Sequence, residues 1–353
     1  MLPRRKTRTV SVGRILIGSD YPIPVQSMTN TLTEDAESTL RQVKALEAAG
    51  ADIVRISVPN AEAAAAFGKI VKQAGVPLIS DIHYDYKMAL LTADAGAGCL
   101  RINPGNIGSA AGVKEVVKAA KANHCSIRIG VNGGSLERGL LEKYGEPCAQ
   151  AMVESALTQA QMLEDLDFHN IKISVKASDT MMTIQAYELL AQQSDYPLHL
   201  GVTEAGGLMD GTIKSAMAFG HLLYKGIGDT IRVSLTADPV EEIKAGKKIL
   251  KAFKLSNKGI NIVSCPTCSR RCIDVIGLVE ALEKKYENEQ RNITLAVMGC
   301  TVNRLEALHA DFGVYGLDKN NNTCKLCVKG EEVAILNQAE VLDRFDSLFN
   351  ASL

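Results

Sequence analysis

The sequence lacks a surplus of charge of either sign. Its 353 residues contain 39 Lys and Arg and 40 Asp and Glu, so the formal net charge is -1. A nearly neutral chain has no overall electrostatic attraction to nucleic acid or to an anionic membrane surface. An anionic ligand must therefore be bound by a local cluster of basic residues.

The sequence also lacks a hydrophobic run long enough to span a membrane. The basic stretch at residues 1–13, MLPRRKTRTVSVG, is followed by no apolar core of signal-peptide length. We therefore expect a cytoplasmic protein, in which thiols stay reduced. The sequence has nine cysteines, an odd number that cannot all pair in disulfides. This number favours metal binding plus ordinary buried thiols over a disulfide framework.

Short β-branched runs alternate with amphipathic helical stretches up to about residue 255, which is typical of parallel βα units. Eight such units predict a closed (β/α)8 TIM barrel over residues 1–255, and a doubly wound open sheet is the competing fold. The expected strands are Ile23–Ser27, Ile53–Val58, Leu78–His83, Cys99–Asn103, Ile127–Val131, Ile171–Val175, Leu198–Val202 and Thr230–Leu235. Among the helix signals, Thr33 is expected to be an N-cap and Pro239 a first-turn proline.

Polar residues recur at the carboxyl ends of the expected strands, where a TIM barrel collects its active site. One arginine at such a place is more often an ion pair with a helix, but eight strand ends converge in a barrel. Basic residues outnumber acidic ones there, so we expect the mouth to attract an anion. The residues are Gln26, Arg55, Asp81, His83, Arg101, Asn103, Arg128, Asn132, Lys172, Lys176, His199, Glu204, Arg232 and Ser234.

Two loops strengthen this expectation. RINPGNIG at 101–108 and RIGVNGGS at 128–135 each combine arginine with Gly and Asn residues, which allow left-handed or closely approaching backbone. Successive N–H groups there, with a helix opening near Ser109, predict a nest for a phosphate or diphosphate. Ordinary tight turns are the alternative.

Residues 256–353 are expected to form a smaller α/β domain. Strands at Asn261–Ser264 and Thr294–Met298 flank a helix at Ile273–Tyr286, and a hairpin around Lys329 and Gly330 precedes a final helix at Ala339–Phe349. Parallel neighbouring strands here would bring the residues that follow them to one edge of the sheet.

Three cysteines follow these strands: Cys265 and Cys268 in SCPTC, and Cys300 in AVMGC, with Glu306 six residues later. Three thiolates can hold three irons of a cubane cluster and leave the fourth iron for a weaker ligand or a substrate. Zinc is the main alternative, since its structural sites close with four N or S ligands.

Other cysteines bear on that alternative. Cys272 is a possible further ligand because it lies four residues after Cys268. Cys324 and Cys327 lie three apart on an expected strand and so face opposite sides. Cys99, Cys125 and Cys148 are interpreted as buried core thiols.

Many separate segments together resemble the bacterial, two-domain form of the 4-hydroxy-3-methylbut-2-enyl diphosphate synthase family. They are PIPVQSMTNT, DIVRISVP, PLISDIHYDY, LRINPGNIG, IRIGVNGGSL, KISVKASD, YPLHLGVTEAGG, KGIGDTIRVSLTADP, SCPTCSRR and AVMGCTVN. The resemblance implies an iron-sulfur enzyme of the methylerythritol phosphate isoprenoid route, which reductively opens 2-C-methyl-D-erythritol 2,4-cyclodiphosphate and removes water to form 4-hydroxy-3-methylbut-2-enyl diphosphate. It also implies a homodimer in which one subunit's cluster domain caps the other's barrel, with ferredoxin or flavodoxin as electron donor.

The same resemblance implies roles for particular residues. Glu204 is the barrel's acid, and Glu306 is a displaceable carboxylate ligand that completes a 4Fe-4S cluster held by Cys265, Cys268 and Cys300. The residues expected to grip the diphosphate are Arg55, Arg101, Arg128, Asn132, Lys176, Arg232 and Ser234.

After the third cysteine, however, this chain reads TVNRLEALHAD where the family usually reads VNGPGEA. The altered segment supports one alternative function, a paralogue that acts on another phosphorylated substrate. A non-catalytic iron or zinc redox sensor is a second alternative, of a different class.

Overall fold

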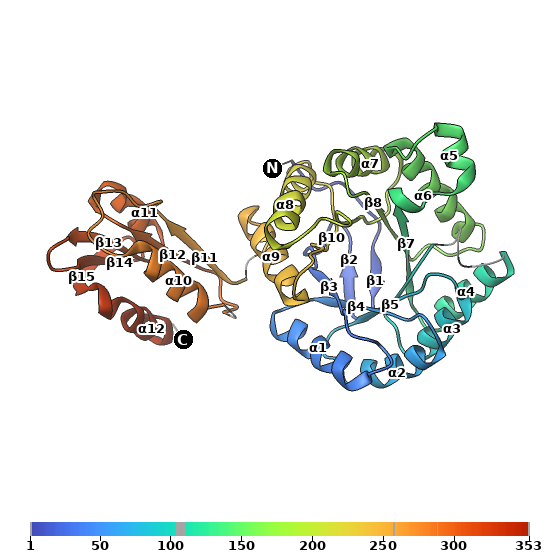
Figure 1. Ribbon diagram of the computed structural model, residues 1–353, viewed down its shortest axis with the longest axis horizontal. Helices are drawn as coiled ribbons and strands as arrows, with labels where there is room; N and C mark the ends of the chain where they lie inside the picture. Colours follow the sequence, from blue (N-terminus) through green and yellow to red (C-terminus); the bar gives the residue numbers. More distant parts are fainter. Residues whose placement is uncertain (1, 104–106, 108–109, 257, 288, 352–353) are drawn as a thin grey trace. The chain divides into compact units, whose positions relative to one another are not determined.

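The computed structural model describes residues 2–351 except 104–106, 108–109, 257 and 288. The chain forms two compact units, Met1–Ser256 and Asn257–Leu353, and each is described by itself (Figure 1). Within the described residues, no helix has the length and apolar character needed to cross a membrane.

The first unit is a closed barrel of eight parallel strands. Six of them pair in sequence order from β3 to β8, and β9 pairs with β10. Single parallel bridges join Ile173 to Leu198 and Val25 to Ile231, which completes the circle. The strands are β3 (Gln26–Met28), β4 (Ile53–Ser57), β5 (Leu78–Asp81), β6 (Cys99–Ile102), β7 (Ser126–Asn132), β8 (Ile171–Lys176), β9 (His199–Leu200) and β10 (Thr230–Ile231). The prediction of a TIM barrel is confirmed, and each expected strand overlaps an observed one.

Helices surround this barrel (Figure 1). They are α1 (Ala36–Ala48), α2 (Ala61–Val71), α3 (Tyr86–Asp94), α4 (Ala110–Ala122), α5 (Arg138–Tyr144), α6 (Ala149–Glu164), α7 (Thr180–Gln193), α8 (Leu208–Tyr224) and α9 (Pro239–Ala252), with a 3-10 turn at Gly133–Ser135. Pro239 occupies the first turn of α9, as expected. The prediction of Thr33 as an N-cap is wrong, because the Asp35 carboxylate accepts from the Ser38 N–H and caps α1, whereas the Thr33 hydroxyl donates to the Ser57 carbonyl oxygen at 2.7 Å.

A short hairpin closes the amino-terminal end of the barrel. Its strands β1 (Val10–Val12) and β2 (Ile15–Ile17) pair antiparallel. Val12 and Ile17 pack on Ile53, Ile79 and Cys99, which are all fully buried. These contacts remove the lower end of the barrel interior from water.

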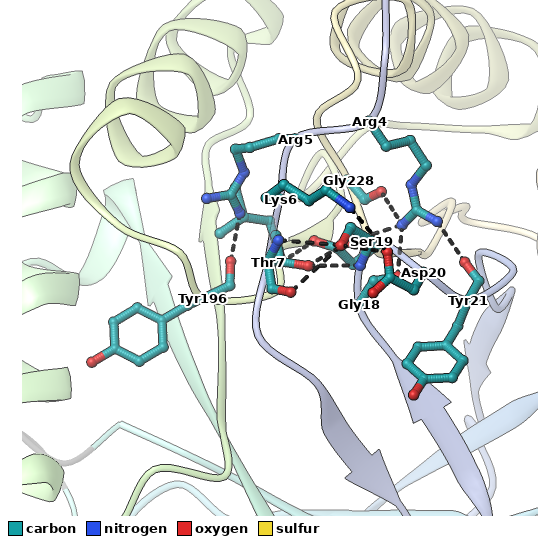
Figure 2. A network of polar contacts seen from close by, with 12 residues as sticks. Arg4, Arg5, Lys6, Thr7, Gly18, Ser19, Asp20, Tyr21, Tyr196 and Gly228 are labelled. Atoms are coloured by element: carbon teal, nitrogen blue, oxygen red, sulfur yellow. Dashed lines mark hydrogen bonds and ion pairs between the residues drawn. The ribbon is translucent and has the colours of Figure 1, made fainter.

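A polar network holds the segment before this hairpin in place (Figure 2). The Arg4 guanidinium donates from Nη2 to the Gly18 carbonyl oxygen at 3.0 Å and to Asp229 Oδ1 at 2.9 Å. The Asp229 side chain is only 3% exposed. Burial raises the pKa of Asp229, and Arg4 and the Leu198 N–H oppose that increase. Arg4 therefore compensates a carboxylate that is costly to bury.

The second unit is a five-stranded mixed sheet with the strand order β11-β12-β13-β14-β15. The β11, β12 and β13 strands are parallel, and β13, β14 and β15 are antiparallel. Its elements are β11 (Ile260–Ser264), α10 (Val275–Lys285), β12 (Ile293–Met298), α11 (Arg304–His309), β13 (Phe312–Asp318), β14 (Thr323–Val328), β15 (Glu331–Asn337) and α12 (Val341–Ala351), with 3-10 turns at Thr301–Asn303 and Gln338–Glu340. The expected hairpin is present, and Lys329 and Gly330 both have positive φ in its turn.

We predict that Arg4→Met lowers the free energy of unfolding of the barrel by about 2 kcal/mol, because it removes the cation that is hydrogen-bonded to the buried Asp229 carboxylate. Urea unfolding followed by far-UV circular dichroism measures this change. Lys6→Met is the matched control, because Lys6 is 89% exposed and reaches Asp20 only at 3.4 Å, and it should change stability by less than about 0.5 kcal/mol. Equal effects of the two substitutions would show that the Arg4 network contributes nothing.

Candidate functional site

The interior of the barrel changes from apolar to charged along the strands. Ile53 and Cys99 contact the hairpin at the lower end. Two residues further along the same strands lie Arg55 and Arg101. Residues two apart on a strand point to the same face, so both arginines point into the barrel above the apolar plug. The strand sequences thus place cations inside the barrel and near its carboxyl-terminal mouth.

Asp81, at the end of β5, holds two of these cations. Its carboxylate lies 3.2 Å from Arg55 Nη2 and 3.2 Å from Arg101 Nη1. Burial raises the pKa of Asp81, but the charges of Arg55 and Arg101 outweigh burial and lower it to about 2. Arg101 Nη1 also lies 2.9 Å from His83 Nε2. Asp81 therefore stays ionised and orients both guanidinium groups.

A second carboxylate, Glu242 of α9, holds Arg232. The Arg232 Nε and Nη2 atoms each lie 3.1 Å from a different oxygen of Glu242. Ser27 Oγ donates to the same carboxylate at 2.7 Å, and the Leu235 N–H donates at 3.1 Å. Sequence reasoning missed Glu242, although an acidic residue in the first turn after the last strand was a usable signal. Arg232 keeps only Nη1 outside this pair, 3.7 Å from the sulfur of Met28.

Three further cations in the interior form no ion pair with a carboxylate among the residues that the structure describes. Arg128, Lys172 and Lys176 are 1%, 1% and 6% exposed. Within the part of the chain that the structure describes, Arg128 Nε and Nη1 and Lys172 Nζ lack a hydrogen-bond partner. Burial, followed by the charge of Arg128, lowers the pKa of Lys176 well below its usual value, and burial lowers the pKa of Arg128 to about 10. An anion would relieve this uncompensated positive charge.

Close backbone approach makes room for these long side chains. A Cβ at Gly201 would lie 2.3 Å from Lys176 Nζ, and a Cβ at Gly130 would lie 2.5 Å from Arg101 Nε. A larger residue at either glycine would displace a cation of the site. Both glycines therefore leave room for the cations of the site.

The remaining residues expected at the mouth take different positions. Asn132, the last residue of β7, and Ser234, three residues after β10, are both partly buried. Glu204 is exposed and has a φ of 51°, in the left-handed region. In the expected phosphate nest of residues 101–108, positions 104–106 and 108 lie outside the described residues, as does the expected helix start at 109.

The second unit gathers cysteines at one edge of its sheet. Cys265 and Cys300 follow the parallel strands β11 and β12. The Gly299 N–H donates to Cys265 Sγ at 3.2 Å, and the Cys272 N–H donates to the Gly299 carbonyl oxygen at 2.7 Å. Cys268 is exposed. An amide already directed at a sulfur is the kind of contact that stabilises thiolate ligands and cluster sulfide.

The donor set at this edge fits an iron-sulfur cluster by its chemistry. All nine cysteines are free thiols. Glu306 is exposed in the first turn of α11, six residues after Cys300. Among the described residues, no three His, Cys, Asp or Glu side chains converge to metal-binding distance. The structure thus places thiols at one edge of the sheet, with a carboxylate close to them in the sequence. Among the described residues, these groups do not converge on one point.

Two other cysteines are structural. Cys324 and Cys327 are fully buried in β14 and belong to different apolar clusters. Burial raises the pKa of each thiol to about 11. The strand between them is continuous from Thr323 to Val328, so the two sulfurs face opposite sides and stay protonated.

The fold and these residues define a TIM-barrel protein with a cationic interior and a C-terminal α/β domain that carries cysteines. The chain belongs to the GcpE family. A family model described as the GcpE TIM-barrel domain matches residues 7–247, and one described as the GcpE protein C-terminal domain matches residues 261–351.

Curated relatives support the same assignment over nearly the whole chain. A protein of Jannaschia sp. (strain CCS1) is 57% identical over 316 residues, which cover 89% of this chain and 84% of that protein. A protein of Hyphomonas neptunium is 54% identical and covers 98% of this chain and 91% of that protein. A protein of Zymomonas mobilis is 52% identical over 351 residues, which cover 99% of this chain and 93% of that protein. All three are named 4-hydroxy-3-methylbut-2-en-1-yl diphosphate synthase (flavodoxin).

We predict that Asp81→Asn lowers the free energy of unfolding by about 2 kcal/mol at neutral pH, because the folded-state pKa of about 2 lies below the usual 3.8. A carboxyl group whose pKa is lowered by folding stabilises the fold at pH values above its unfolded-state pKa. This stabilisation is lost as the pH falls through the folded-state pKa. The penalty should therefore shrink toward pH 2, as shown by urea unfolding at several pH values. Asp20→Asn, at a carboxylate that is 69% exposed, serves as the control, and a pH-independent penalty at Asp81 would contradict the assignment.

Proposed function

We propose that this chain is an iron-sulfur oxidoreductase that converts 2-C-methyl-D-erythritol 2,4-cyclodiphosphate into 4-hydroxy-3-methylbut-2-enyl diphosphate in isoprenoid biosynthesis. The reaction opens the cyclic diphosphate, takes up two electrons and releases one hydroxyl as water. The observation that supports this most strongly is the group of buried cations in the barrel, joined to more than 50% identity with relatives of that name.

In this proposal the barrel, residues 1–255, binds the diphosphate. Arginine forms bidentate charge-assisted bonds with phosphate oxygens, and lysine acts as a compact charge. Arg128, two nitrogens of which lack a partner among the described residues, and Lys176, whose pKa burial lowers, gain most from the anion. Asp81 and Glu242 hold the other guanidinium groups in position. The proposed substrate contacts are Arg55, Arg101, Arg128, Asn132, Lys176, Arg232 and Ser234.

The second unit, residues 256–353, would hold a 4Fe-4S cluster through Cys265, Cys268 and Cys300, with Glu306 as a weaker oxygen ligand. Such a cluster supplies electrons one at a time. Glu204 is proposed to move protons as the hydroxyl leaves. Glu204 is exposed in the loop that follows β9, with its backbone in the left-handed region.

The proposed electron donor is flavodoxin, which the relatives' names mention, or a ferredoxin.

We also propose a cytoplasmic homodimer. On α8, three apolar side chains are exposed: Met209 is 72%, Ile213 48% and Met217 61% exposed. Their spacing of four residues places them on one helix face, which would be covered by a second copy of the chain.

A paralogous activity on another phosphorylated substrate is the second candidate. It is favoured by the segment after Cys300, which forms a 3-10 turn and then α11. A metal or redox sensor is disfavoured, because a sensor has no need for buried cations that lack partners.

One preparation separates these functions. We predict that the protein purified without oxygen is brown, contains about four irons and four sulfides per chain, and converts the cyclodiphosphate when given a strong reductant. Iron and sulfide analysis together with product detection measure the outcome. A brown but inert protein would indicate the paralogue, and a colourless zinc protein would indicate the sensor.

We predict that Glu306→Ala abolishes turnover while iron and sulfide content stays near that of the native protein, because the three thiolates retain the cluster. Glu280→Ala, at an exposed residue of α10, is the matched control and should leave both quantities unchanged. Cys268→Ala should lose iron as well as activity. Full turnover by Glu306→Ala would remove this carboxylate from the mechanism.

A further inference from the structure

Lys172 lies in the barrel interior, further from the mouth than Lys176 of the same strand. It lies on β8, four residues before Lys176, and pairs in register with Arg128 of β7. A strand rises about 3.3 Å per residue, so the Lys172 backbone lies well below the mouth. Its side chain is among the largest fully buried ones in the protein, at 1% exposure.

The surroundings of Lys172 do not explain an ammonium group. Its Nζ has no oxygen or nitrogen partner among the residues that the structure describes. The groups that act on it are the Arg128 guanidinium from β7 and the Cys99 thiol from β6. His199 of β9 also interacts with Lys172, and burial and then Lys176 lower the pKa of His199 well below its usual value, so that it is neutral. His199 Nδ1 lies 2.6 Å from Thr230 Oγ1.

The interior carboxylate Asp81 does not compensate Lys172 either. Asp81 is already shared by Arg55 and Arg101. A buried ammonium beside another cation is costly in the empty protein, and a hydrocarbon of similar size would be tolerated better. The energetic reason for a lysine at this position must therefore lie in a state with an anion bound.

We propose that Lys172 is a positioning residue of the anion site, which attracts the bound diphosphate from beside Arg128 and gains a proton when the anion binds. This inference rests on the proposed function, since it concerns the same site. It adds a residue beside Arg128 and a proton that is taken up with the substrate.

The charge state of Lys172 in the empty site supports this coupling. Burial, the largest cause, lowers the pKa of Lys172 to about 8; Cys99 opposes that decrease and Arg128 adds to it. At pH 8 about half of the empty molecules therefore lack this proton. A bound dianion favours the charged ammonium and raises the pKa, so binding takes up the missing fraction. At pH 6.5 nearly all molecules already carry the proton, and Lys172 contributes no uptake.

Calorimetric titration of the whole, cluster-loaded protein with the cyclodiphosphate, without reductant, tests the inference. Without electrons the ligand binds but does not react. Each of its phosphorus atoms carries one strongly acidic oxygen, so the ligand itself does not titrate near neutral pH. Titrations in buffers of different ionisation enthalpy then give the number of protons taken up by the protein.

We expect Lys172→Met to weaken binding about tenfold and to reduce proton uptake by about half a proton at pH 8, with no reduction at pH 6.5. Lys172→Arg should retain the affinity within a few-fold and still lose the uptake, because arginine stays protonated. Lys114→Met, at an exposed residue of α4, is the control and should behave like the native protein. Because Lys172→Met removes a buried charge, the thermal midpoint of this variant should equal or exceed that of the native protein. Such a midpoint would show that weaker binding is not caused by misfolding.

Two results would contradict the inference. Proton uptake at pH 8 that is the same in the native protein and in Lys172→Met would show that Lys172 does not titrate with binding. Unchanged affinity in Lys172→Met would show that it does not attract the anion. Failure of the native protein to bind the cyclodiphosphate at all would instead overturn the proposed function, so the two failures are distinguishable.

Discussion

The accumulation of positive charge inside the barrel is the constraint on which the rest of this structure depends. Arg101, Arg128, Lys172 and Lys176 are all nearly inaccessible to water, and like charges in a medium of low dielectric constant repel strongly. Asp81 offsets part of that repulsion by contacting two arginines at once. A fold that keeps this arrangement without a ligand must derive its stability elsewhere.

The apolar lower end of the barrel and the wall supply that stability. The hairpin residues Val12 and Ile17 fill the interior below the cations, and the Arg4 contacts hold the preceding segment. A large continuous core packs the helices on the outer face of the strands. The two ends of the barrel thus have separate roles, with stability concentrated at the closed end and binding at the open end, as the TIM fold generally arranges them.

The sequence predicts the wall of the barrel well because each strand carries its own local signal of β-branched residues bounded by turns. It predicts the location of charged residues at strand ends for the same reason. It does not predict their pairing: Arg232 was expected to contact the diphosphate, yet two of its nitrogens bind Glu242 from the following helix. The hairpin at residues 10–17 was missed because its role depends on distant residues such as Ile79, and no local pattern reveals such a contact.

The segment after Cys300 shows how a family feature can be replaced by other local structure. Glycine turns adopt backbone conformations that Arg304 and Leu305 resist. The structure avoids this conflict, because Arg304 has φ of -54° and ψ of -29° and begins α11, a conformation that both residues favour. Glu306 then lies in the first helical turn, where the helix dipole favours a carboxylate. The altered sequence therefore places Glu306 on a short helix, and this helix, in place of a glycine turn, sets the position of the carboxylate relative to Cys300.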